Sequence, residues 1–156
     1  DSVRFVCVQC HGDGQEHARK YGDLSALVIF TSDAAISPRD KNSPCLACHQ
    51  RDRQTYWIGS VHEARDIACV DCHRIMEPAS ERNALVNPSE ADVCATCHLQ
   101  QRAQLMRSSH MPMREGKVMC SDCHNPHGTS TEKMLVDATV NENCYRCHAE
   151  KRGPFL

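Results

Sequence analysis

The sequence has few of the side chains that fill an ordinary protein interior. Aromatic residues make up only 4% of its 156 residues, and the 40% counted as hydrophobic includes 12 cysteines. The longest apolar run extends from Leu24 to Phe30 and contains Ser25, so it falls far short of the about 20 residues that a membrane-spanning helix needs. A chain of this length is expected to form one domain, but not around a conventional core. Something other than side chains must fill the interior.

A large excess of charge of either sign is also absent. The chain has 18 Lys and Arg against 20 Asp and Glu, which gives a formal net charge of -2. This balance argues against binding to nucleic acid or to an anionic membrane surface. No leader-peptide pattern is visible, so we expect Asp1 to begin an exported chain whose signal peptide has been removed.

What the sequence does have is one motif repeated six times. All 12 cysteines form C-x-x-C pairs, and each pair is followed directly by a histidine. C-x-x-C-H is the attachment sequence for c-type haem, in which both thiols bind the porphyrin and the histidine ligates the iron. Numbered along the chain, motifs one to six are Cys7, Cys10 and His11; Cys45, Cys48 and His49; Cys69, Cys72 and His73; Cys94, Cys97 and His98; Cys120, Cys123 and His124; and Cys144, Cys147 and His148.

Two other kinds of site use paired cysteines. Two C-x-x-C pairs about 20 residues apart have the spacing of a structural zinc site, and a disulfide scaffold would also use many cysteines. Neither alternative requires a histidine at the same position after every pair. The pattern therefore predicts six covalently bound haem c groups.

The histidines outside the motifs are the expected sixth ligands of the irons. They are His17, His62, His110 and His127. Six haems with two histidines each would need more than the 10 histidines present, so at least two irons need another donor. Met76 lies three residues after His73, as His127 lies three after His124. Methionine is an accepted axial ligand, so Met76 is a candidate, and the alternative is a residue that packs against a porphyrin.

The motif spacing indicates a duplication. Cys45 and Cys94 are 49 residues apart, and Cys69 and Cys120 are 51 apart, so a two-haem repeat recurs about every 50 residues. We expect one hexahaem domain, 1–156, made of a half-repeat plus a loop (1–44), two full repeats (45–93 and 94–143) and a truncated half-repeat (144–156). A histidine equivalent to His62 would lie beyond Leu156 in the last half-repeat, so one haem is expected to lack an internal sixth ligand.

The predicted fold is mostly irregular with short α-helices, almost no sheet, and stacked haems in place of a core. Residues 24–30 are expected to form a short strand or extended stretch, and residues 33–44 a surface loop. The segments that begin at the second and fourth motifs run for ten or more residues without Pro or Gly, which favours short helices. Ser89 is expected to cap a helix that starts at Glu90.

Two segments carry a resemblance to a known family. SSHMPMREGKVMCSDCHNPHGT, residues 108–129, and CYRCHAEKRGPFL, residues 144–156, resemble periplasmic decahaem cytochromes of porin–cytochrome conduits, the MtrA/DmsE type. The pentahaem donor to periplasmic nitrite reductase is similar. The resemblance implies an electron-transfer protein with closely stacked, mostly bis-histidine haems. This chain departs from both types in having six motifs rather than five or ten.

The sequence thus predicts a hexahaem c-type cytochrome that conducts electrons in the periplasm or outside the cell and is not itself an enzyme. Expected partners are other cytochromes or a membrane quinone-oxidising complex. Assembly into a homopolymeric filament, or participation in an outer-membrane conduit, is compatible with this interpretation. The alternative is a multihaem reductase of a small oxyanion, which would use a haem with an open iron face.

Overall fold

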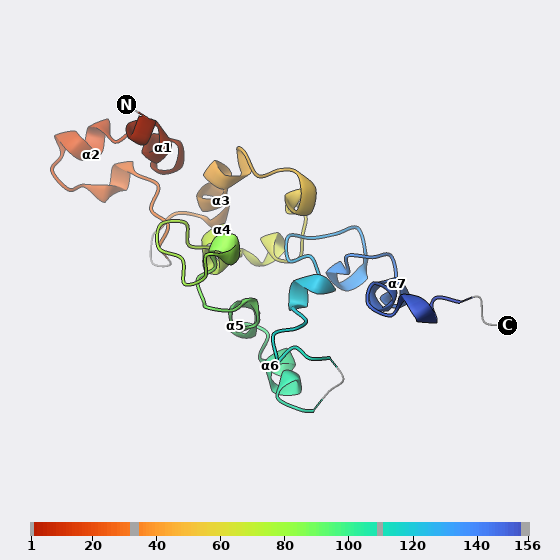
Figure 1. Ribbon diagram of the computed structural model, residues 1–156. Helices are drawn as coiled ribbons and strands as arrows, with labels where there is room; N and C mark the ends of the chain where they lie inside the picture. Colours follow the sequence, from red (N-terminus) through yellow and green to blue (C-terminus); the bar gives the residue numbers. More distant parts are fainter. Residues whose placement is uncertain (1, 32–34, 109–110, 154–156) are drawn as a thin grey trace. The chain divides into compact units, whose positions relative to one another are not determined.

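The computed structural model describes residues 2–31, 35–108 and 111–153 (Figure 1). The chain divides into two compact units. Unit 1 contains Asp1–Gln50 and Arg65–Val86, and unit 2 contains Arg51–Ala64 and Asn87–Leu156. Residues 51–64 therefore belong to unit 2, although the residues before and after them belong to unit 1. Three of the six motifs fall in each unit.

Unit 1 consists of short helices joined by irregular chain. Its α-helices are α1 (Ser2–His11), α2 (Gln15–Arg19), α3 (Pro38–Leu46) and α4 (Cys69–Cys72), and its 3-10 turns are η1 (Leu24–Ala26) and η4 (Arg82–Ala84). The turn η3 (Glu63–Arg65) lies where the chain passes back from unit 2 to unit 1.

Unit 2 has the same character. Its α-helices are α5 (Glu90–Ala95), α6 (Leu99–Leu105) and α7 (Val140–Tyr145), and its 3-10 turns are η2 (Asp52–Gln54), η5 (Cys120–Asp122), η6 (Glu132–Met134) and η7 (Ala149–Lys151). In both units together, the only β-pairing among the described residues consists of three isolated bridges. The predicted fold class, irregular chain with short helices and almost no sheet, is confirmed.

Each even-numbered motif is reached through a capped helix. In α3, α5 and α7 a Ser or Thr precedes the helix, and its side-chain oxygen accepts a hydrogen bond from the backbone N–H of an acidic residue three positions later. This arrangement satisfies one of the backbone donors that a helix start leaves unpaired. The pairs are Ser37 with Asp40, Ser89 with Asp92, and Thr139 with Glu142. The predicted cap at Ser89 is confirmed.

The surface loop predicted at residues 33–44 is wrong, because α3 begins at Pro38. The segment is rich in Ser, Pro, Asp and Asn, a composition typical of loops, but these residues also form the start of a helix. Ser37 caps the helix, and Pro38 occupies the first turn, where the missing N–H does no harm. Of the expected loop, residues 33 and 34 lie outside the described part of the chain.

Two other local expectations are met only in part. Residues 24–30 form no strand: they begin with the 3-10 turn η1, and Leu27 after it has an extended conformation. Asp23 caps this turn by accepting a hydrogen bond from the Ser25 N–H. After the second motif only the 3-10 turn η2 forms, whereas the helix expected after the fourth motif is present as α6.

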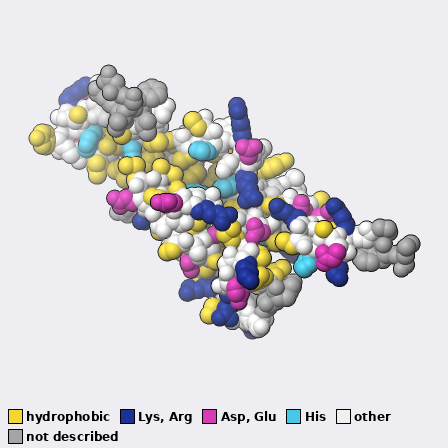
Figure 2. Space-filling view, in the orientation of Figure 1, with side chains coloured by type: hydrophobic (Ala, Val, Ile, Leu, Met, Phe, Trp, Pro, Cys, Tyr) yellow, Lys and Arg dark blue, Asp and Glu magenta, His cyan; other side chains and the backbone are white. Residues whose placement is uncertain are grey.

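Hydrophobic side chains do not form a core in the described residues. Only Trp57, Ala68 and Leu85 are buried hydrophobic residues, and many large hydrophobic side chains lie exposed on the surface, as Figure 2 illustrates for one face. Polar residues form much of the buried set: Lys41, Asn42, Ser60, Asn125 and Asn143. No described helix is both long enough and apolar enough to cross a membrane.

The buried asparagines join one motif to the next. Asn42, in α3, accepts a hydrogen bond from the Cys69 N–H at 2.7 Å and donates to the carbonyl of Ile67 at 3.3 Å. Asn143, in α7, donates to the carbonyl of Cys123 at 3.0 Å. In α5 the corresponding contact comes from Glu90, whose carboxylate accepts from the backbone and hydroxyl of Ser121. Each capped helix therefore binds the backbone of a neighbouring motif.

We predict that Asn42→Ala lowers the free energy of unfolding by about 1–3 kcal/mol, because it leaves the backbone groups of Cys69 and Ile67 buried without partners. Guanidinium unfolding of the haem-loaded protein, followed by far-UV circular dichroism, measures the change. Asn141→Ala, at an exposed position of α7, is the matched control. Equal midpoints for the two variants would contradict the role given to Asn42.

Candidate haem-binding sites

The histidines of motifs one, three and five are held in the same way. In each, the Nδ1 atom lies within hydrogen-bond distance of a backbone carbonyl oxygen. The pairs are His11 with Val28 at 2.9 Å, His73 with Asn83 at 2.7 Å, and His124 with Lys133 at 2.9 Å. A carbonyl oxygen can only accept, so Nδ1 carries the proton and Nε2 keeps its lone pair for a metal. This is the tautomer that a haem-ligating histidine needs.

The accepting carbonyls belong to three short segments, which we call straps: residues 24–28, 82–86 and 132–136. Each strap consists of a 3-10 turn and the two residues after it. The last residue of each strap is a valine whose N–H donates at 3.0 Å to the preceding motif. The pairs are Val28 with His11, Val86 with Cys72, and Val136 with Cys123. A strap therefore closes over each odd-numbered motif.

The backbone of two straps is strained. Asn83 and Ala84 have φ values of 62° and 49°, and Lys133 and Met134 both have 55°. Residues other than glycine rarely adopt positive φ, and such conformations persist where the surrounding structure requires them. Here the strained residues Asn83 and Lys133 supply the carbonyls that hold the motif histidines.

The histidines of the even-numbered motifs are held differently. His49, His98 and His148 are exposed, and no carbonyl of the described residues accepts a hydrogen bond from their rings. Nδ1 of His148 instead lies 3.6 Å from a carboxylate oxygen of Glu150, which is also exposed. The six motif histidines therefore fall into two classes that alternate along the chain.

Two of the four additional histidines share the carbonyl contact. Nδ1 of His17 lies 2.9 Å from the Asp23 carbonyl, and Nδ1 of His62 lies 2.7 Å from the Pro126 carbonyl. Both rings are half-buried, and both present Nε2 as the free nitrogen. The predicted ligand His110 lies outside the described residues.

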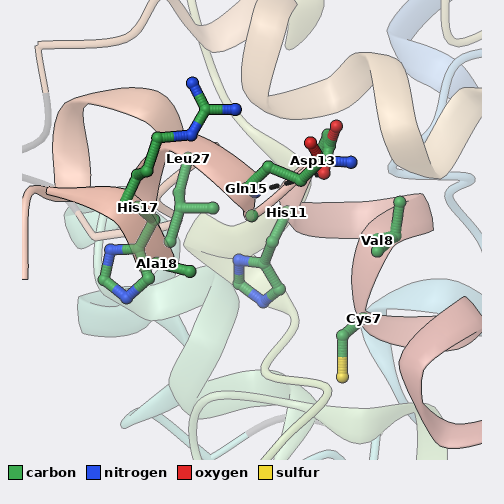
Figure 3. Close-up of a pocket in the computed structure, with 11 residues that line it drawn as sticks. Cys7, Val8, His11, Asp13, Gln15, His17, Ala18 and Leu27 are labelled. Atoms are coloured by element: carbon green, nitrogen blue, oxygen red, sulfur yellow. Dashed lines mark hydrogen bonds between the residues drawn. The ribbon is translucent and has the colours of Figure 1, made fainter. Parts of the chain in front are cut away.

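His17 lines a cavity of about 800 Å³ together with His11 and Cys7 of the first motif. In Figure 3 the two imidazole rings and the Cys7 sulfur all point toward the same side of the site. The volume lies within the usual range of cofactor pockets. This arrangement suits a porphyrin joined to Cys7.

Rings also approach one another in unit 2. The centroids of His62 and His98 are 6.1 Å apart, and the planes meet at 64°. His127 is half-buried, with its ring centroid 6.2 Å from that of the buried Trp57.

The first cysteines of neighbouring motifs meet in pairs. The Cys45 thiol is hydrogen-bonded to Cys69, which lowers the pKa of Cys45 to about 7, and the same contact raises the pKa of Cys69. In unit 2, a hydrogen bond to Cys94 lowers the pKa of Cys120. The attachment points of motifs two and three therefore adjoin, as do those of motifs four and five.

The two alternative uses of the cysteines do not fit this geometry. All 12 cysteines are outside disulfide bonds. Among the described residues, one group has three potential metal ligands in reach of one another: Glu90, Cys94 and Cys120. A structural zinc site of the predicted spacing would also use Cys97 and Cys123, which are not in this group.

Met76, the candidate methionine ligand, lies in a different environment from His127, the residue at the corresponding position after motif five. Met76 is 84% exposed, whereas His127 is half-buried beside Trp57. The two residues nevertheless follow corresponding backbone contacts, because Arg74 and Asn125 each donate from N–H to a strap carbonyl. Met76 therefore stays a prediction as an iron ligand.

The straps were not predicted, although a short sequence pattern marks them. Leu-Val follows Ala at residues 26–28 and 84–86, and follows Met at residues 134–136. These tripeptides follow the first, third and fifth motifs. The pattern is short and apolar, so it resembles ordinary packing residues unless it is aligned on the motifs.

Comparison with known proteins identifies the family of the chain. Residues 7–97 match the family described as cytochrome c-type protein NrfB-like, and residues 110–153 match the doubled CXXCH motif. The chain is 39% identical over 153 residues to the multiheme cytochrome MtrA of Shewanella baltica (strain OS185). That alignment covers 96% of this chain but only 44% of the relative, so the chain spans less than half of that protein. The chain belongs to the NrfB-like multihaem c-type cytochromes, a class of electron-transfer proteins.

Proposed function

We propose that this chain conducts electrons through six covalently attached haems, one at each C-x-x-C-H motif. The observation that carries the proposal is the common hydrogen bond of five histidines. In each, Nδ1 donates to a backbone carbonyl, so Nε2 is the nitrogen that can bind iron. These histidines are His11, His17, His62, His73 and His124. The haem supplies an iron that changes oxidation state by one electron. The chain's own residues attach it, orient its ligands and set its surroundings.

The proposed attachment set is the 12 motif cysteines, and the six motif histidines are the proximal ligands. The sixth ligands are proposed to be His17, His62, His110 and His127, with Met76 as a further donor. Unit 1 contains three motifs and, of these additional histidines, only His17. Unit 2 contains three motifs and the other three histidines. Unit 1 therefore contains fewer histidines for its three motifs than unit 2 does, and it also contains Met76.

The adjoining cysteines support electron transfer within pairs of haems. Cys45 and Cys69 shift each other's pKa, and the sulfurs of Cys94 and Cys120 lie within 4.8 Å of one another, so the porphyrins joined to them start from neighbouring positions. These are the pairs of the proposed two-haem repeats, 45–93 and 94–143. We propose that residues 1–44 and 144–156 act as half-repeats beside them.

The setting and partners are proposed from the resemblance to periplasmic conduit cytochromes. On that resemblance we propose a periplasmic or extracellular location. Proposed partners are other cytochromes or a quinone-oxidising membrane complex. A homopolymer or an outer-membrane conduit would extend the same path of electrons.

The haem count has a direct test. We expect the protein matured with haem to exceed its polypeptide mass by six haem groups under denaturing conditions. Replacing Cys7 and Cys10 by serine should remove the mass of one haem and leave the other five. The mass of the bare polypeptide, or of the polypeptide with zinc, would contradict the proposal.

The straps offer a means of setting haem potentials. A histidine that donates Nδ1–H to an acceptor becomes a more basic ligand, which stabilises the oxidised iron and lowers its potential. Histidines of the odd-numbered motifs have a carbonyl acceptor, whereas those of the even-numbered motifs have none among the described residues. We propose that the strap contact lowers the potentials of haems one, three and five below the values they would have without it.

Leu85→Ala tests this proposal. The Leu85 side chain is 8% exposed, and its backbone forms bridges with His73 and Ser80. Its packing therefore helps to hold the strap whose Asn83 carbonyl contacts the His73 ring. Truncation should loosen the strap and raise the potential of one haem in a spectroscopic redox titration. Ile75→Ala, at a neighbouring residue that is 74% exposed, is the control. Unchanged potentials in a Leu85→Ala chain that keeps all its haems would contradict the tuning role.

A further inference from the structure

The segment 51–64, which follows the second motif, packs against residues of the fifth. Asn125 donates from Nδ2 to the Arg53 carbonyl at 2.8 Å, and the Pro126 carbonyl lies 2.7 Å from Nδ1 of His62. Gly128 makes the closest approach. A side chain there would collide with the carbonyl of Tyr56, and φ at this position is +102°. The position of His62 is therefore fixed by the loop after motif five.

This placement brings His62 to the histidine of the fourth motif. The ring centroids of His62 and His98 are 6.1 Å apart. A histidine nitrogen lies about 2 Å from the metal that it binds, and the ring centre lies about 1 Å further out, so two imidazoles on opposite sides of one metal have centroids about 6 Å apart. The observed separation matches this value.

The hydrogen bond of His62 is consistent with ligation. Its Nδ1 donates to the Pro126 carbonyl, so Nε2 is the nitrogen with a free lone pair. Such a contact to the outer nitrogen fixes the ring orientation of metal-bound histidines. His98 follows directly after Cys97, which places its ring at the proximal position of haem four.

We infer that His62 and His98 are the two axial ligands of a single iron, that of haem four. The inference rests on the proposed haem-binding function and adds to it the pairing of ligands. The histidine between the second and third motifs then serves neither of their haems. It binds the haem of the fourth motif and is held by the loop after the fifth, so segment 51–64 joins two motifs of unit 2.

A chain that lacks haem four distinguishes this pairing from any other partner of His62. The experiment introduces His62→Ala into the full chain and into a chain in which Cys94 and Cys97 are both replaced by serine. In the full chain, low-temperature EPR of the oxidised protein should show one new high-spin iron. In the chain without haem four, the same substitution should add none. A new high-spin iron in both chains would overturn the pairing.

His17→Ala is the matched control, because His17 has the same carbonyl contact but lies in unit 1. Its effect should be the same whether or not haem four is present. Denatured masses establish six haems in the full chain and five in the serine chain. Masses without haem would refute the proposed function, whereas correct masses with equal EPR changes would refute only the pairing.

The unmodified protein provides a second measurement should the serine chain not fold. In the fully reduced state, the His62 ring protons should give nuclear Overhauser effects to the porphyrin whose thioether protons contact Cys94 and Cys97. Effects to a porphyrin attached at any other motif would overturn the pairing.

Discussion

The contact on which the sites depend is the hydrogen bond from an imidazole Nδ1–H to a backbone carbonyl. It occurs at His11, His17, His62, His73 and His124, at distances of 2.7 to 2.9 Å. It fixes which nitrogen carries the proton, limits rotation of the ring and raises the basicity of the other nitrogen. Because the acceptor is backbone, the contact depends on the path of the chain rather than on any one side chain.

The rest of the fold serves to place those carbonyls. Two straps adopt positive φ at residues that are not glycine, a strain of about 1–3 kcal/mol at each position that surrounding contacts must offset. Capped helices and buried amides supply those contacts, as Asn42 and Asn143 do when they bind the backbone of neighbouring motifs. With three buried hydrophobic residues among those described, polar contacts organise most of the chain.

The motifs, the scarcity of sheet and the cap at Ser89 could be predicted because each depends on residues close together in the sequence. The helix at Pro38–Leu46 was missed because its composition is that of a loop, although Ser37 and Asp40 form a cap. The contact between His62 and His98 could not be predicted, since residues 51–64 belong to unit 2 although they follow a motif of unit 1 in the sequence. Sequence spacing alone would have assigned His62 to its nearest motifs.

Nitrogen-15 NMR of the fully reduced protein, with labelled histidine, tests the central claim most directly. We predict slowly exchanging protons on Nδ1 of the five carbonyl-bound histidines, and faster exchange at His49, His98 and His148, which lack this contact among the described residues. Metal-bound Nδ1 atoms, or equal exchange rates in the two groups, would contradict the account.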